Sequence, residues 1–277
     1  MIDSILNILL LSAPLLLASL GALVSEYAGR TAVFIDGMLN LSAFLCYAFT
    51  VLTKSPAAGC TLSVVCCTAF IVLFLTAVEY VHANPFLAAL ALNIFAGALV
   101  SLVSVEIFGT RGVLTSTHFI FRALPARYGT TITAYILAAA GILFLFTTKR
   151  GLYIRITGTN SDVLLSKGIN VSGNRILAGS IAAVYASCAG CILAIRLSSF
   201  VPNISSGQGW LALAAVFLGK RTSTGTIIAV TVMCAAEYFA SNMQNVLPHI
   251  STPLLLSFPY IMAIILIFIE PGKNQKN

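Results

Sequence analysis

Asp36 and Asn40 are polar side chains inside a long apolar run, where an ionised or hydrogen-bonding group is costly unless it has a partner or a task. They are four residues apart, so in a helix they share one face. Gly37 stands beside them and permits a bend or a close approach. Because a carboxylate and an amide can bind an uncharged polar solute by hydrogen bonds, we expect this face to line a polar cavity. The alternative is a buried Asp36 that is hydrogen-bonded between helices.

Asn93, Glu237 and Trp210 are the other candidates for this cavity. Asn93 is the lone polar group in the middle of its apolar run, and packing or solute binding would each explain it. Glu237 follows small residues, so a hydrogen bond between helices is its alternative role. Trp210 is the only Trp of the chain, and it would either anchor the membrane interface or stack on the ring of a solute.

The composition identifies an integral membrane protein. Hydrophobic residues make up 59%, charged residues 8%, and the mean hydropathy is +1.00, whereas a soluble domain carries roughly 25% charged residues. The apolar runs are long and continuous, which favours helices over the alternating strands of a barrel. We therefore predict an all-α, polytopic transmembrane helical bundle of about eight to ten spans, with residues 1–277 forming a single domain.

One apolar run is too short to cross a bilayer, which takes roughly 20 helical residues. It covers 209–219, and we expect a re-entrant or half-crossing segment, because such segments survive only when buried in protein or lining an aqueous cavity. The predicted spans, this short one included, are 5–24, 32–53, 61–78, 86–108, 131–148, 176–195, 209–219, 226–243 and 253–269.

Residues 149–175 form a polar, basic loop that holds five of the fifteen Lys and Arg residues and one acid, Asp162. Positive charge favours the cytoplasmic side, so the loop is placed there. The spans then alternate so that ten of the fifteen basic residues, and the C-terminus, lie in the cytoplasm. The basic residues expected outside are Lys54, Arg111, Arg122, Arg127 and Arg196.

Residues 109–130 are the external segment, where aromatic residues mix with arginines. An interfacial helix lying on the bilayer is one interpretation. A contact for an extracytoplasmic partner is the other.

Several catalytic signatures are absent from the sequence. It contains no G-x-x-x-x-G-K-[ST], no H-E-x-x-H and no G-x-S-x-G, so we expect no ATPase site of its own, no enzyme and no cofactor. Cys188 and Cys191 have CxxC spacing within a span and no neighbouring histidine, which favours small apolar packing over metal or redox chemistry. The positive charge follows the membrane topology, so no nucleic acid is expected as a partner.

Four segments resemble the permease subunits of bacterial ABC importers for simple sugars, nucleosides and branched-chain amino acids. Residues 20–30 (LGALVSEYAGR) with 35–38 (IDGM) are similar to the family pattern GALISERAG…GLEGMM. Residues 91–94 (ALNI) match another family span. Residues 158–171 (GTNSDVLLSKGINV) resemble the coupling segment GENPEAAESAGINV, and 206–219 (SGQGWLALAAVFLG) resemble GRGFIALAAVILG.

The resemblance implies a pore-forming subunit of the inner membrane that moves a nucleoside or similar small polar ring compound inward by alternating access. Its implied partners are ABC ATPase subunits, a second and different permease subunit, an extracytoplasmic substrate-binding lipoprotein and membrane lipid. The implied substrate cavity contains Asp36, Asn40, Asn93, Glu237 and Trp210. The residues implied to couple to the ATPase are Arg155, Gly158, Asn160, Asp162, Lys167 and Gly168.

The sequence departs from the family pattern at Thr159, which replaces an acid, at Ser161, which replaces a proline, and at Asp36, which replaces a glutamate. The Ser-Glu-Tyr-Ala-Gly form looks most like the nucleoside branch. Permeases for riboflavin or a simple sugar share the architecture and stay open as alternatives. An ion-coupled secondary transporter is a weaker alternative, because no internal repeat is visible.

Overall fold

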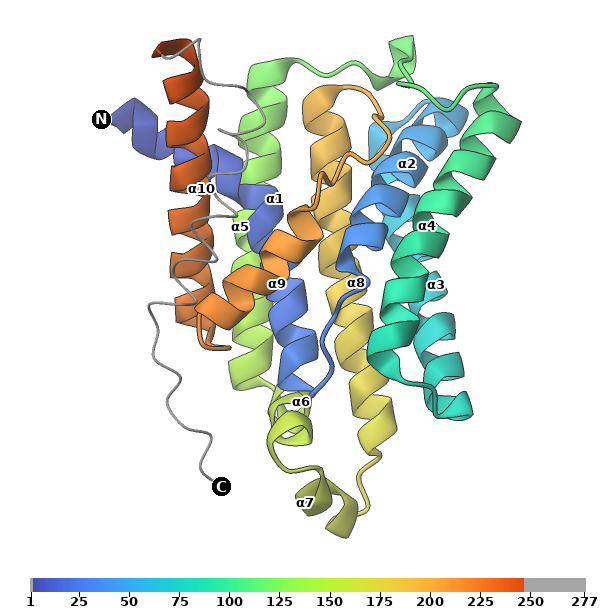
Figure 1. Cartoon of the computed structure of the whole chain (residues 1–277), viewed down its shortest axis with the longest axis vertical. Coiled ribbons are helices and arrows are strands. Elements are labelled where there is room, and N and C mark those ends of the chain that lie inside the picture. The colour runs from blue at the N-terminus through green and yellow to red at the C-terminus, as the bar shows by residue number, and fades with distance from the viewer. Residues whose placement is uncertain (1, 247–277) are drawn as a thin grey trace.

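The structure is a computed structural model in which residues 2–246 are described, and it is a bundle of helices (Figure 1). Seven of the described helices are long and apolar enough to cross a membrane, which confirms the all-α prediction. The expected span 253–269 and the C-terminal tail lie outside the described residues. The elements are α1 Ile2–Tyr27, α2 Ile35–Thr53, α3 Pro56–Val81, α4 Pro85–Phe108, η1 Thr117–Phe119, α5 Ala123–Thr147, α6 Lys149–Thr159, α7 Ser161–Ser166, α8 Val171–Leu197, α9 Gln208–Leu218 and α10 Ser223–Val246.

The helices α1, α2 and α8 form the centre of the bundle. Small residues allow their backbones to approach closely, as is usual where lipid provides no hydrophobic drive between helices. A Cβ on Gly21 would lie 3.0 Å from the carbonyl oxygen of Ala182, and one on Gly190 would clash with the carbonyl of Leu39 and the hydroxyl of Ser42. In contrast, α3, α4 and α5 present many large apolar side chains on the surface, as expected of helices that face lipid or a partner subunit.

Two of the membrane segments are broken. Residues 28–34 run without helical structure from the end of the bundle that carries α6, and α2 begins only at Ile35, well inside the bundle (Figure 1). Residues 198–207 enter from the opposite end before α9 begins at Gln208. The predicted short segment is therefore confirmed as α9, whereas the predicted span 32–53 begins in non-helical chain.

The external segment 109–130 is not one interfacial helix. Residues 109–122 form a strap across one end, in which Leu114 pairs with Phe200 through two backbone hydrogen bonds of 2.9 and 3.0 Å. Phe119 of the strap is fully buried, and α5 begins at Ala123. The second part of the segment therefore belongs to a membrane helix, and the strap is held by its own buried side chain.

The basic segment 149–175 is not a loop. It folds into α6 and α7, and its last residues form the first turns of α8, which begins at Val171 and not at 176. Thr148 caps α6 by accepting from the amide of Gly151 at 3.0 Å, and Asn170 caps α8 by accepting from Gly173 at 3.0 Å. Such side-chain caps allow helices to begin in a stretch with few apolar residues.

We predict that Gly190→Ala destabilises the bundle, because its Cβ would clash with backbone and side-chain atoms of α2. Overpacking of this kind costs about 1–3 kcal/mol. The measurement is the thermal midpoint of the purified protein in detergent. Gly97→Ala is the matched control, since a Cβ there has no atom within 4 Å. Equal midpoints for the two variants would show that the α2–α8 contact can relax.

Candidate functional site

The start of α2 lies inside the helical bundle (Figure 1), where the first amide groups of a helix have no partner within the helix and little access to water. Asn93 of α4 provides one. The amide of Gly37 donates to Asn93 Oδ1 at 2.8 Å, and Asn93 Nδ2 donates to the carbonyl of Val33 at 2.7 Å. The side chain thus caps α2 from a neighbouring helix and also satisfies the unwound chain before it.

The start of α9 is satisfied in a similar way from α2. The amide of Gly209 donates to Asp36 Oδ1 at 3.1 Å. A Cβ on Gly209 would lie 2.5 Å from the Cα of Asp36, so the two backbones approach as closely as only glycine permits. Asp36 therefore joins the beginnings of two helices, α2 and the short α9, that lie far apart in the sequence.

Asn40 holds the non-helical segment 198–207 against α2. The amide of Ser205 donates to Asn40 Oδ1 at 3.1 Å, and Asn40 Nδ2 donates to Ser205 Oγ at 2.8 Å and to the carbonyl of Asp36 at 3.2 Å. Ser205 is fully buried. Both polar atoms of Asn40 are therefore used within the chain.

Three side chains at this junction have hydrogen-bonding or stacking capacity that the described part of the chain does not use. Asp36 is half-buried, and only one of its carboxylate oxygens has a donor among the described residues. The Oε1 atom of Gln208, the first residue of α9, is buried without a hydrogen bond. Trp210 is 45% exposed. Gln208 is a candidate residue that the sequence analysis did not include in the expected cavity. Its position at the start of the short segment, two residues before Trp210, could have identified it.

The structure brings together three of the five expected cavity residues, Asp36, Asn40 and Asn93. Trp210 is the next residue after Gly209 and lies at the same junction. Glu237 lies on α10, where its backbone carbonyl accepts from Ser241 Oγ at 2.9 Å. No described hydrogen bond connects Glu237 to the α2–α9 junction.

The α6–α7 unit carries the second set of candidate residues. Gly158 of α6 lies against the turn that follows α1, with its Cα 3.3 Å from where a Cβ on Gly29 would stand. A Cβ on Gly158 would clash with the carbonyl of Tyr27 and lie 2.8 Å from the amide of Gly29. The contact of α6 with the start of segment 28–34 therefore requires a residue without a side chain.

The other predicted coupling residues differ in what they contact. The Arg155 guanidinium lies 4.7 Å from the Phe146 ring centroid, a cation–π distance, and its Nε is buried without a hydrogen bond. Arg155 therefore packs towards the end of α5. The remaining residues, Asn160, Asp162, Lys167 and Gly168, are exposed on and around α7.

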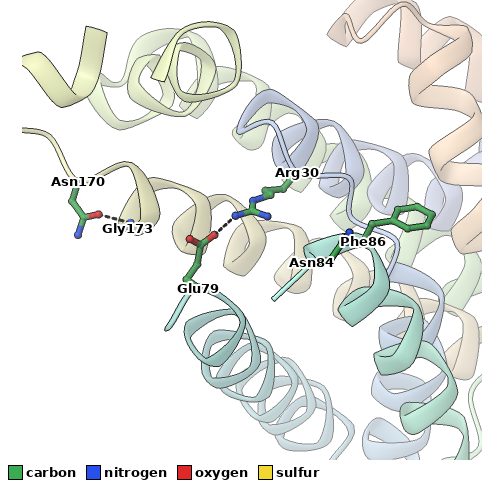
Figure 2. A network of polar contacts seen from close by, with 6 residues as sticks. All are labelled: Arg30, Glu79, Asn84, Phe86, Asn170 and Gly173. Atoms are coloured by element: carbon green, nitrogen blue, oxygen red, sulfur yellow. Dashed lines mark hydrogen bonds and ion pairs between the residues drawn. The ribbon is translucent and has the colours of Figure 1, made fainter. Parts of the chain in front are cut away.

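Two ion pairs tie the turn after α1 to other elements at this end. Arg30 Nη2 lies 2.6 Å from Glu79 Oε1 at the end of α3, as Figure 2 shows beside the first residues of α4. Arg221, in the turn before α10, lies 3.1 Å from Glu26 Oε1. The chain between Glu26 and Arg30 is thus held to α3, to the α9–α10 turn and to α6 before it enters the bundle.

The cysteines form a cluster that their spacing in sequence does not predict. The sulfurs of Cys46, Cys60 and Cys191 all lie within 4.8 Å of one another, with 3.5 Å between those of Cys46 and Cys60. The CxxC partner Cys188 is outside this trio. The trio joins α2, α3 and α8. None of its three members is among the residues of the polar junction around Asp36.

Comparison with known proteins places this geometry in a family. Residues 4–269 match the family model described as "Branched-chain amino acid transport system / permease component". The chain is 25% identical to the "Nucleoside ABC transporter permease protein NupC" of Lactococcus lactis subsp. cremoris (strain MG1363), over 77% of this chain and 74% of that protein. It is 27% identical to the "Guanosine ABC transporter permease protein NupQ" of Bacillus subtilis (strain 168), over 76% and 73%.

A solved structure has a similar fold. It is "PsaBC from Streptococcus pneumoniae in complex with Fab", with a TM-score of 0.57, 10% sequence identity, and coverage of 96% of this chain and 92% of that chain. The family model covers nearly the whole sequence, including both broken segments and the α6–α7 unit. The chain therefore belongs to the family of branched-chain amino acid transport system permease components.

Proposed function

We propose that this chain is the membrane-spanning permease subunit of an ATP-driven (ABC) importer, and that it moves a nucleoside or a similar small polar ring compound inward. The family match and the two relatives named as nucleoside and guanosine permeases support the transport class. The observation that carries the proposal is the junction at which Asp36 joins the starts of α2 and α9 inside the membrane.

The groups left without partners at this junction suit a nucleoside. The second oxygen of Asp36 and Oε1 of Gln208 are acceptors for ribose hydroxyls or base N–H groups. The exposed ring of Trp210 offers a face for base stacking. Asn40 and Asn93 have both polar atoms bonded within the chain, so their proposed role is to position the site.

The two broken segments are the elements that we propose move. Segments 28–34 and 198–207 enter the bundle from opposite ends and lead to α2 and to the short α9, respectively (Figure 1). Non-helical backbone at membrane depth is tolerated where it lines a cavity. Tilting of α9 against α2 about the Asp36–Gly209 hydrogen bond would expose the site to one end and then to the other.

The α6–α7 end is the proposed cytoplasmic end and ATPase-docking surface. Exposed apolar side chains on α7, Val163 at 42% and Leu165 at 60%, favour contact with a protein partner. The charge distribution supports this side. The segment 28–34, α6, α7, the start of α8 and the α9–α10 turn lie at this end (Figure 1) and contain Arg30, Lys149, Arg150, Arg155, Lys167, Arg175, Lys220 and Arg221. The turn after α2, the segment 109–122, the start of α5 and the end of α8 lie at the other end and contain Lys54, Arg111, Arg122, Arg127 and Arg196.

The remaining partners follow from this orientation. A substrate-binding lipoprotein would dock at the end that carries the strap 109–122. A second permease, different from this chain, would pack against it so that the two enclose the pathway. The exposed apolar faces of α3, α4 and α5 leave room for that subunit and for lipid.

The function is tested by uptake into proteoliposomes that contain the assembled importer with its ATPase subunits. We expect accumulation of labelled guanosine only when ATP is present on the ATPase side. Riboflavin and ribose serve as competitors, since they represent the alternative cargoes. Uptake by this chain alone under a proton or sodium gradient, without ATP, would refute the ABC mechanism.

We predict that Asp36→Asn and Asp36→Leu separate the two roles of this side chain. Asn keeps an acceptor for the Gly209 amide but replaces the free carboxylate oxygen by a donor, so uptake should fall by about tenfold or more while the protein stays folded. Leu also removes the acceptor, and the Gly209 amide left without a hydrogen bond should lower the free energy of unfolding by about 1–3 kcal/mol. Uptake and detergent thermal midpoints are measured together; full uptake by Asp36→Asn would remove Asp36 from the substrate site.

We predict that Gly158→Leu uncouples transport from the ATPase. The side chain would push α6 away from the turn after α1, so substrate-stimulated ATP hydrolysis and uptake should be lost, while the spans still insert. Thr159→Leu is the matched control, because Thr159 is the next residue along the chain and its side chain is exposed. Co-purification of the ATPase subunit and its stimulation by substrate are the measurements, and wild-type values for Gly158→Leu would contradict the coupling role of α6.

A further inference from the structure

A polar groove opens at the α6–α7 end, between the turn after α1, the start of α4 and the first turns of α8. It has a volume of about 390 Å³ and is lined by Gly29, Arg30, Thr31, Pro85, Phe86 and Arg175. Figure 2 shows Arg30 and Glu79 beside the first residues of α4, with the capped start of α8 on the other side. A deeper extension shares Arg30, Thr31, Pro85 and Arg175 and continues towards Phe34.

The groove holds one positive charge without a partner. Arg30 is paired with Glu79 at 2.6 Å, and their charges cancel. Glu26, the nearest other acid along the chain, is already paired with Arg221 at 3.1 Å and accepts from Thr31 at 3.2 Å. No described acid pairs with Arg175, and its Nε is buried without a hydrogen bond.

An uncompensated guanidinium that is partly withdrawn from water is costly, and a bound anion removes that cost. A planar guanidinium presents parallel donors that match the oxygens of a phosphate group. A phosphodiester carries one negative charge, which balances the net charge of +1 on Arg30, Glu79 and Arg175 together. The charge balance therefore favours a monoanionic phosphate ester over a multiply charged anion.

The ring of Phe86 edges the groove, and further apolar side chains are exposed on the adjoining ends of α3 and α4. Phe86 is 49% exposed and Leu87 is 61% exposed at the start of α4. Tyr80, near the end of α3, is 85% exposed, and aromatic rings of this kind are enriched at the level of lipid headgroups. A polar floor with an apolar rim at this level fits an amphiphile better than a free ion.

We propose that this groove binds the phosphodiester headgroup of an anionic phospholipid, with Arg175 as its main contact and Arg30 as the second. Basic pockets between transmembrane helices are sites for such headgroups. The bound lipid would join α4 and α8 to the turn after α1, which is the chain that leads into segment 28–34. This inference concerns lipid and stands independently of the cargo proposed above.

The test is lipid retention by the full-length chain in its purified complex. The complex is equilibrated in detergent with equal amounts of phosphatidylglycerol and phosphatidylcholine, and retained lipid is measured by mass spectrometry. We expect selective retention of phosphatidylglycerol, and a loss of about five- to tenfold in Arg175→Gln. Arg175→Lys, which keeps the charge but not the planar fork, should retain an intermediate amount.

Arg150→Gln is the matched control, since Arg150 is an exposed arginine at the same end but outside the groove. It should retain phosphatidylglycerol as the unmodified chain does. Equal retention of the two lipids, or unchanged retention in a folded Arg175→Gln variant, would overturn the proposal. Binding of millimolar inorganic phosphate that Arg175→Gln abolishes, with no selective retention of phosphatidylglycerol, would show that the groove takes free phosphate and would overturn the proposal.

Discussion

The structure depends on a constraint that the membrane imposes on helix ends. A helix that begins where water is excluded has first-turn amide groups without a partner in the helix, and each amide that the preceding turn does not bind needs another acceptor. Both α2 and α9 begin in this way, and each receives a side-chain acceptor from another helix: Asn93 for Gly37, and Asp36 for Gly209. The polar residues at depth are therefore required by the backbone geometry, and the same geometry leaves the second Asp36 oxygen available to a solute.

A continuous set of contacts connects this junction with the proposed ATPase-docking surface. Gly158 of α6 touches the turn at Gly29, and the ion pairs of Glu26 and Arg30 fix the position of that turn. Residues 28–34 then lead directly to Asp36. Because this stretch is not helical, a displacement of α6 can be taken up by a few backbone dihedrals at its entry, and it can reach α2 without deforming the packed helices α1 and α8.

Much of the fold follows from the sequence, because hydropathy and length define membrane helices directly. The same argument identified the short segment that became α9. It could not show that the polar stretch 149–175 is helical, because caps at Thr148 and Asn170, and not an apolar periodicity, allow those helices to begin. Spacing also could not find the trio of Cys46, Cys60 and Cys191, whose members come from three helices that meet only in the folded chain.

The candidate site shows the same division between local and distant information. Asp36 and Asn40 could be paired from their spacing, since they are one helical turn apart. Their main partners, Gly209 and Ser205, are 173 and 165 residues away. Gln208 becomes a candidate only because the contact between Asp36 and Gly209 brings the start of α9 to this junction. In the proposed mechanism, tilting of α9 strains the hydrogen bond between Asp36 and Gly209, and a substrate hydroxyl at the second oxygen of Asp36 would bias the position of α9. The residue that joins the starts of α2 and α9 is thus also the proposed contact for the substrate.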